Sequence, residues 1–145
     1  MANLIANTQF GVMQEAFYNF SSTDNSSNYY VHMKTNIAAS SNNMFYIEAE
    51  GYNYGAGYPI LCAWSGYPYS GNGMLINVGL RTHYSGMQAY TAYQSTNGYV
   101  VLVGYAGSHY YTGFVLNSIM ANPYGYNFKV SISAAVQTST SVNYY

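Results

Sequence analysis

Hydrophobic and polar residues alternate most regularly between Tyr126 and Val136, near the end of the chain. Every second residue in this stretch is apolar, and lysine, serine and alanine lie between the apolar positions. A period of two places the apolar side chains on one face of a β-strand. Because that face needs a covering layer, the pattern predicts an antiparallel strand in an interior position of a sheet. The apolar positions are Phe128, Val130, Ile132, Ala134 and Val136.

Seven shorter runs upstream have the same character, because β-branched and aromatic residues dominate them and none shows a helical period over about 10 residues. Asn97-Gly98 separates two of the runs and is a strong hairpin signal, and a turn is expected at residues 122–125. About eight short strands predict an all-β fold with negligible helix, as an antiparallel β-sandwich or a jelly-roll-like form. The seven runs cover residues 29–35, 44–50, 58–64, 74–80, 87–94, 99–105 and 109–117.

Two of these runs allow finer predictions. The run 58–64 is apolar on both faces, which is typical of a central strand, and it contains Trp64 and Cys62. We assign both side chains to the core. In the run 74–80 every second residue is apolar, which places four side chains on one side of a strand. These are Met74, Ile76, Val78 and Leu80.

Residues 1–27 differ from the rest of the chain. Seven large apolar side chains are spaced irregularly there, and the segment ends in the turn-forming sequence SSTDNSSN. Two interpretations are open: a first strand followed by a loop, or an arm that docks on a neighbouring subunit. Residues 28–145 are expected to form the β-sandwich, and 145 residues correspond to one domain.

Charge restricts the partners of this protein. Charged residues make up 5% of the chain, against about 25% in an average soluble protein, and the net charge is −1. Three cationic side chains are too few to neutralise a row of phosphates or to bind an anionic membrane, so we expect neither partner. The sequence has no stretch of about 18 apolar residues and begins without an export signal. A surface rich in Tyr, Ser, Asn and Gly without such a signal is typical of a virion component assembled in the host cytoplasm.

Residues with catalytic or metal-binding chemistry are few. Glu48 and Glu50 lie two apart on one strand, so their Cα atoms are about 6.6 Å apart, but neighbours on one strand point the same way rather than across a cleft. We expect them on a solvent-facing edge strand. His32, His83 and His109 are too scattered to be a ligand set within one chain, and a site shared among three subunits is the alternative. The sequence therefore predicts no enzyme, no catalytic residues, no metal and no cofactor.

Aromatic residues are densest between residues 51 and 69. Tyrosine side chains stack on sugar rings or fill protein interfaces at low entropic cost. Those flanked by glycine and proline are the better surface candidates, and we predict a ligand-binding role for them. They are Tyr52, Tyr54, Tyr58, Tyr67 and Tyr69.

Five segments of the sequence resemble β-domains in virion-surface proteins of tailed phages of aquatic bacteria, and the resemblance covers about residues 29–140. It implies a sandwich fold and, commonly, a homotrimer, and it transfers no active-site residue. The segments are YYVHMKTNI, FYIEAEGYNYG, NGYVVL, YYTGF and NPYGYNFKVSISAAVQTST.

We therefore expect a structural virion protein, as a tail- or head-fibre, collar or capsid decoration subunit that contacts other virion proteins and host-surface glycans. A free-standing carbohydrate-binding module is the alternative. We also expect a homo-oligomer, because a monomer exposing the apolar side chains of residues 1–27 would carry an adhesive patch and few charges to repel other copies. Closed symmetry, most simply a trimer, covers such a surface without open-ended growth.

Overall fold

The computed structural model describes residues 5–8, 11–24, 27–72, 74–108, 110–121 and 128–145. The turn predicted at residues 122–125, the start of the predicted last strand and His109 lie outside these ranges. Within them the chain forms ten β-strands, and none of the described residues belongs to a helix long and apolar enough to cross a membrane. The strands are β1 (Ile5–Thr8), β2 (Gly11–Ser22), β3 (Ser27–Ala38), β4 (Met44–Asn53), β5 (Tyr58–Tyr69), β6 (Met74–Thr82), β7 (Gln88–Gln94), β8 (Tyr99–Ser108), β9 (Thr112–Ala121) and β10 (Ile132–Thr138).

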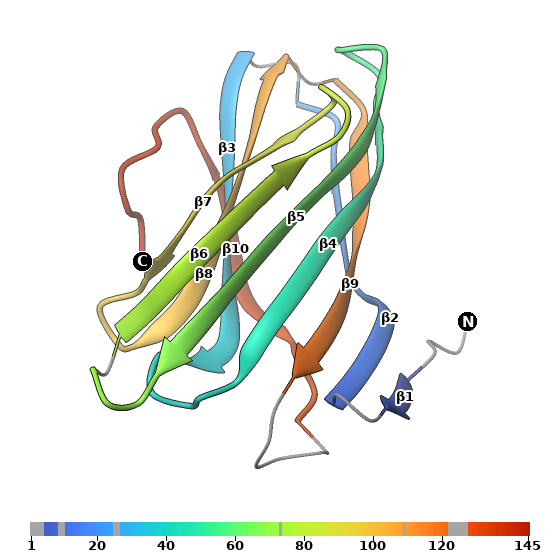
Figure 1. The fold of residues 1–145 in the computed structure, drawn as a ribbon. Coiled ribbons are helices and arrows are strands. Elements are labelled where there is room, and N and C mark those ends of the chain that lie inside the picture. The colour runs from blue at the N-terminus through green and yellow to red at the C-terminus, as the bar shows by residue number, and fades with distance from the viewer. Residues whose placement is uncertain (1–4, 9–10, 25–26, 73, 109, 122–127) are drawn as a thin grey trace.

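The strands form two antiparallel sheets (Figure 1). The six-stranded sheet has the order β1-β2-β9-β4-β5-β6, and the four-stranded sheet has the order β10-β3-β8-β7. The predicted all-β sandwich is confirmed. The nested pairs β2 with β9 and β3 with β8 are those of a jelly roll, whereas β4, β5 and β6 form a meander within one sheet.

Alternate residues of each strand build the core between the sheets. In β4, the side chains of Phe45, Ile47 and Ala49 are buried, while the residues between them lie on the outer face. Trp64 in β5 is completely buried, as predicted, and its Nε1 donates a hydrogen bond to the Val103 carbonyl of the opposite sheet at 3.0 Å. This bond satisfies the indole N–H, which is buried away from solvent.

Antiparallel pairing sorts the connections between strands into two groups. The connections that follow β2, β4, β6 and β8 lie at one end of the sandwich, at the top of Figure 1. Those that follow β3, β5 and β7 lie at the other end. Loops far apart in sequence are therefore neighbours in space.

The last strand differs from its prediction in both bounds and position. β10 begins only at Ile132 and lies at the edge of its sheet beside β3, so the predicted interior position is wrong. A β-bulge between Ile132 and Ala134 also shifts the register. Ile132 lies opposite the buried Thr35 on the inner face, whereas Val136 lies opposite His32 on the outer face.

β6 shows a second bulge. Asn77 has a φ of 53°, and the register against β5 shifts at this point. Ile76 lies opposite Tyr67 on the outer face, whereas Leu80 lies opposite Trp64 on the inner face. The prediction that four apolar side chains of this strand share one side is therefore wrong, because a bulge exchanges the two faces. The four are Met74, Ile76, Val78 and Leu80.

The N-terminal strands belong to the sandwich of this chain. β1 pairs with β2, and β2 pairs with β9 along most of its length. Phe17 and Phe20 of β2 pack against the core. The contact of residues 1–27 with a neighbouring subunit stays a prediction.

Residues 139–145 cover part of the outer face of the four-stranded sheet, where His32 is completely buried. The His32 Nδ1 lies 3.1 Å from the Tyr93 hydroxyl, and its Nε2 lies 3.2 Å from the Thr140 carbonyl. The backbone N–H groups of Tyr144 and Tyr145 donate to the same Tyr93 hydroxyl at 3.0 and 3.2 Å. We call this segment the C-terminal strap.

Candidate functional site

Two connections at the upper end of Figure 1 join their backbones through hydrogen bonds. In the turn between β4 and β5, the Tyr54 N–H donates to the Tyr111 carbonyl at 3.5 Å and the Gly55 N–H donates to the Tyr110 carbonyl at 3.1 Å. The Tyr110 and Tyr111 rings are 4.4 Å apart between centroids, and Tyr54 lies 5.9 Å from the first and 6.3 Å from the second. These three rings form one aromatic cluster.

The connection between β6 and β7 is attached to the same end. The buried Asn53 donates from its Nδ2 to the Gly86 carbonyl at 2.8 Å. A side chain at Gly86 would lie 2.5 Å from the Pro59 carbonyl oxygen, so glycine is required for this close approach. The connection, which carries Tyr84, is thereby held against the start of β5, where Tyr58 lies.

We call the surface formed by these three connections and the adjoining ends of β4 and β5 the tyrosine end. Five of its tyrosines are between 44% and 60% exposed, whereas Tyr110 is partly covered. The pKa of Tyr110 is raised, mainly by its hydrogen bond with Tyr111 and further by burial. The surface offers aromatic ring faces edged with hydroxyl groups that can donate and accept hydrogen bonds. The five exposed members are Tyr52, Tyr54, Tyr58, Tyr84 and Tyr111.

The structure divides the five tyrosines that were predicted to bind a ligand. Three of them belong to the tyrosine end. Tyr67 and Tyr69 lie at the opposite end of β5, with ring centroids 5.7 Å apart. The three that belong to the tyrosine end are Tyr52, Tyr54 and Tyr58.

Sequence reasoning missed three members of the tyrosine end: Tyr84, Tyr110 and Tyr111. They lie outside the stretch that is densest in aromatics. A usable signal was the order of the strands, since each of these tyrosines follows an even-numbered strand. Connections after even-numbered strands of an antiparallel sandwich of this kind meet at one end.

Glu48 and Glu50 lie on the outer face of β4, which is an interior strand between β9 and β5. The prediction of an edge strand is therefore wrong, although the face itself is open to solvent. Glu48 accepts a hydrogen bond from the Tyr46 hydroxyl at 2.9 Å, and Glu50 accepts one from the Asn117 Nδ2 at 2.7 Å. Both carboxylates are thus held in place by a neighbour.

The remaining candidates are separated from one another. His32 is buried on β3, while His83 is exposed after β6 with its ring 5.0 Å from Tyr84. Among the described residues, no three His, Cys, Asp or Glu side chains form a group that could hold a metal ion. Cys62 is buried, as predicted, and burial together with the nearby Glu48 charge raises the pKa of its thiol to about 12, so the thiolate that would react is scarce.

Comparison of the chain with protein-family models, with curated proteins and with solved structures finds no match. Function is therefore inferred from the residues of this chain. The tyrosine end is the surface that carries most of the predicted binding residues.

Proposed function

We propose that this protein is a surface-recognition subunit that binds neutral saccharides through its tyrosine end, and that it works on the exterior of a tailed-phage virion. The observation that carries the proposal is the convergence of exposed tyrosines from three separate connections. The virion setting follows from the resemblance and the composition of the sequence. Its partners there would be other virion proteins and glycans of the host surface.

The chemistry of the tyrosine end suits an uncharged ligand. A tyrosine side chain has two rotatable side-chain torsions, so ordering it on a ligand costs little entropy. Its ring covers the apolar face of a sugar, and its hydroxyl group exchanges hydrogen bonds with the sugar hydroxyls. The backbone hydrogen bonds between the connections hold the cluster in one arrangement before binding, which lowers the cost of association.

A purely structural role in the virion is the second candidate, and the uncovered edge of β6 favours it. β6 is an edge strand of the six-stranded sheet, and Leu80 on its inner face is 46% exposed although it lies opposite the fully buried Trp64. An exposed apolar edge of this kind is suited to contact with another subunit.

Glycan-array binding by the purified full chain tests the proposed function. We expect binding to uncharged glycans that Tyr54→Ala and Tyr111→Ala each weaken about threefold to tenfold, since aromatic contacts contribute about 0.5–1.5 kcal/mol beyond area burial. Tyr69→Ala is the matched control, because this exposed tyrosine lies at the other end of the sandwich. Absence of glycan binding, or equal loss in the control variant, would contradict a saccharide site at the tyrosine end.

The setting is tested separately by electron microscopy of phage particles treated with antibody against the protein. Regular labelling of the particle surface is expected for a virion subunit. Glycan binding without labelling would instead identify a free-standing carbohydrate-binding module. Labelling without glycan binding would leave the structural role as the function.

A further inference from the structure

Three further tyrosines form a cluster on the outer face of the four-stranded sheet. They come from three neighbouring strands: Tyr30 from β3, Tyr105 from β8 and Tyr90 from β7. Tyr30 lies opposite Tyr105 in the register, with ring centroids 4.8 Å apart. Tyr90 stands edge-on to Tyr30 at 5.2 Å and lies 6.3 Å from Tyr105. We call these three residues the sheet cluster.

A β-bulge directs Tyr90 into the sheet cluster. The register between β7 and β8 shifts between Ala89 and Thr91, so Tyr90 is the extra residue. Ala89 and Ala92 belong to the core on the inner face, whereas Tyr90 is 42% exposed on the outer face. Bulges often re-aim a side chain beside a functional site. Here the bulge adds an exposed ring to two rings that the strand pairing already brings together.

The sheet cluster adjoins the tyrosine end. β3 begins and β8 ends at that end of the sandwich, and Tyr30 and Tyr105 lie near those strand termini. The Tyr105 ring extends over Gly107 towards the same end, because a Cβ atom at Gly107 would lie 3.5 Å from the Tyr105 hydroxyl oxygen. Tyr110 of the tyrosine end follows only five residues after Tyr105, so their Cα atoms are at most about 18 Å apart.

The open part of this face is aromatic and polar, not aliphatic. Val101 and Val103 share the outer face with the sheet cluster, but both are fully buried beside His32, where the C-terminal strap docks. Gln88 lies opposite Tyr105 and is exposed. The surface left open therefore consists of ring faces, hydroxyl groups and an amide. This chemistry suits a saccharide better than an apolar protein surface.

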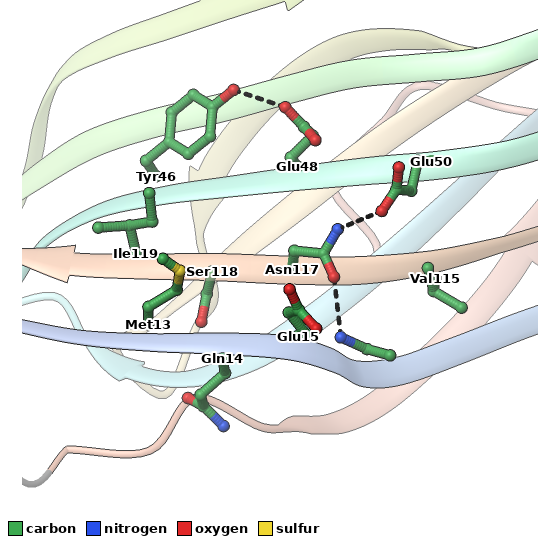
Figure 2. A pocket seen from close by; sticks show the side chains of 11 residues that line it. Met13, Gln14, Glu15, Tyr46, Glu48, Glu50, Val115, Asn117, Ser118 and Ile119 are labelled. Atoms are coloured by element: carbon green, nitrogen blue, oxygen red, sulfur yellow. Dashed lines mark hydrogen bonds between the residues drawn. The ribbon is translucent and has the colours of Figure 1, made fainter. Parts of the chain in front are cut away.

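Most of the negative charge of the chain lies on the opposite side of the sandwich. Three of its four acidic residues lie on the outer face of the six-stranded sheet (Figure 2). Lys34 shares the face of the sheet cluster but lies four residues along β3 from Tyr30, at about 13 Å. These charges lie away from the sheet cluster, which favours an uncharged ligand. The three acidic residues are Glu15, Glu48 and Glu50.

We propose that the sheet cluster is a second subsite for the saccharide bound at the tyrosine end, so that the protein recognises an extended, uncharged oligosaccharide and not a single terminal sugar. The inference rests on the proposed function and specifies the substrate class of the same surface. One sugar ring stacks at the exposed Tyr111, and another ring of the same oligosaccharide stacks at Tyr90. The second contact adds to affinity because, once the first has formed, it takes place at a high effective concentration.

Titration calorimetry on the full chain tests the dependence on ligand length. The probes are the disaccharides and hexasaccharides of three uncharged series: cello-, malto- and N-acetylated chito-oligosaccharides. We expect at least one hexasaccharide to bind about tenfold or more tightly than its disaccharide, with one hexasaccharide for each chain. Equal affinities of the two lengths, or two hexasaccharides for each chain, would overturn the inference and leave the proposed function in place.

Variants of Tyr90 locate the second contact. Tyr90→Ala is expected to weaken hexasaccharide binding about threefold to tenfold and to change disaccharide binding less than about 1.5-fold. Tyr90→Phe keeps the ring and is expected to bind the hexasaccharide within about threefold of the unaltered chain. Tyr69→Ala is the matched control, because Tyr69 is 39% exposed and packs on Tyr67 at the other end of the sandwich. Circular dichroism verifies the fold of each variant.

The remaining outcomes separate this inference from the proposed function. Tyr111→Ala is expected to weaken both ligand lengths, because it removes the contact that they share. If Tyr90→Ala binds the hexasaccharide as the unaltered chain does, or loses both lengths equally, the inference is overturned. Failure of all three hexasaccharides to bind would also overturn it, and the glycan array alone then decides the proposed function.

Discussion

Among the glycines of the described chain, Gly51 leaves the least room for a side chain, because β4 and β9 approach each other closely there. A Cβ atom at this position would lie 2.0 Å from the Gly113 carbonyl oxygen and 2.6 Å from the Phe114 Cα. Both atoms belong to backbone, so neither can rotate away. The spacing of two interior strands therefore depends on the absence of a side chain here.

Gly51→Ala is expected to lower the free energy of unfolding by at least about 2 kcal/mol, because the two strands must separate to admit the methyl group. Urea unfolding measures the change. Gly107→Ala is the matched control in β8, where the nearest atom to the new Cβ is the Tyr105 hydroxyl oxygen at 3.5 Å, and we expect a change within about 0.5 kcal/mol. Equal stability of the two variants would show that the strands separate at no cost.

Some single residues could be placed from the sequence and others could not. Trp64 and Cys62 were assignable to the core because an apolar run surrounds them. The requirement for glycine at residue 51 was not visible, since the clashing atoms belong to a strand more than 60 residues later. Information of that kind lies in the pairing of strands and not in the local pattern.

At the scale of elements, periodicity located the strands but not their bulges. The alternation in 126–136 was a true strand signal, yet the bulge after Ile132 turned Ala134 and Val136 to the outer face. The bulge at Asn77 exchanged the faces in the opposite sense in β6, since Ile76 lies on the outer face and Leu80 on the inner face. A bulge inserts one residue without changing the composition of a run, so a pattern with a period of two cannot reveal it.

The C-terminal strap is the element with a built-in response to pH. The partners of His32 define its neutral form: Nε2–H donates to the Thr140 carbonyl, and Nδ1 accepts from the Tyr93 hydroxyl, whose oxygen accepts from the strap. A proton on Nδ1 would make this nitrogen a donor, so it could no longer accept the hydrogen bond from the Tyr93 hydroxyl. Lys34, on the same face of β3, with its Nζ 5.9 Å from the centre of the Tyr145 ring, would add a second positive charge.

Burial lowers the pKa of His32 below its ordinary value of 6.5, and the hydrogen bond to Thr140 opposes this only in part. A lowered pKa means that the docked strap is fully stable above pH 6.5 and becomes less stable as the pH falls below it. We expect the hydrogen-exchange protection factors of the Tyr144 and Tyr145 amides to be smaller at pH 5 than at pH 7.5. His32→Gln should remove the difference and His83→Gln should keep it, whereas unchanged protection in the unaltered chain would refute the mechanism.

At the scale of the whole molecule, the two sheets are unequal. Six strands pack on four, and β6 lies at the edge of the larger sheet. Leu75 near the start of β6 packs against the core, whereas the strand around Leu80 is open to solvent. Leu80 and Val78 are exposed there, on a strand that pairs with β5 alone within the described residues. The predicted homo-oligomer thus has a candidate interface in addition to residues 1–27.

Light scattering after size-exclusion chromatography tests this interface. We expect the full chain to elute as an oligomer, most simply a trimer, and Leu80→Lys to shift it towards the monomer, because a charge at the edge of a sheet opposes association. Val142→Lys is the control, since Val142 is exposed on the C-terminal strap. A monomeric unaltered chain would contradict the predicted assembly, and an unchanged oligomer of Leu80→Lys would move the interface away from β6.

The placement of charges has a consequence for how the molecule meets its surroundings. The chain is almost neutral, yet three glutamates, Glu15, Glu48 and Glu50, lie on the outer face of one sheet and outnumber Arg81 on the same face, while Lys34 lies on the outer face of the other. Such a separation gives the sandwich a dipole moment that its net charge of −1 does not reveal. A cation diffusing nearby is steered towards the β2–β9–β4 surface, and an anionic surface turns the molecule to present its four-stranded sheet. Orientation, not attraction, is then what the few charges of this protein provide at long range.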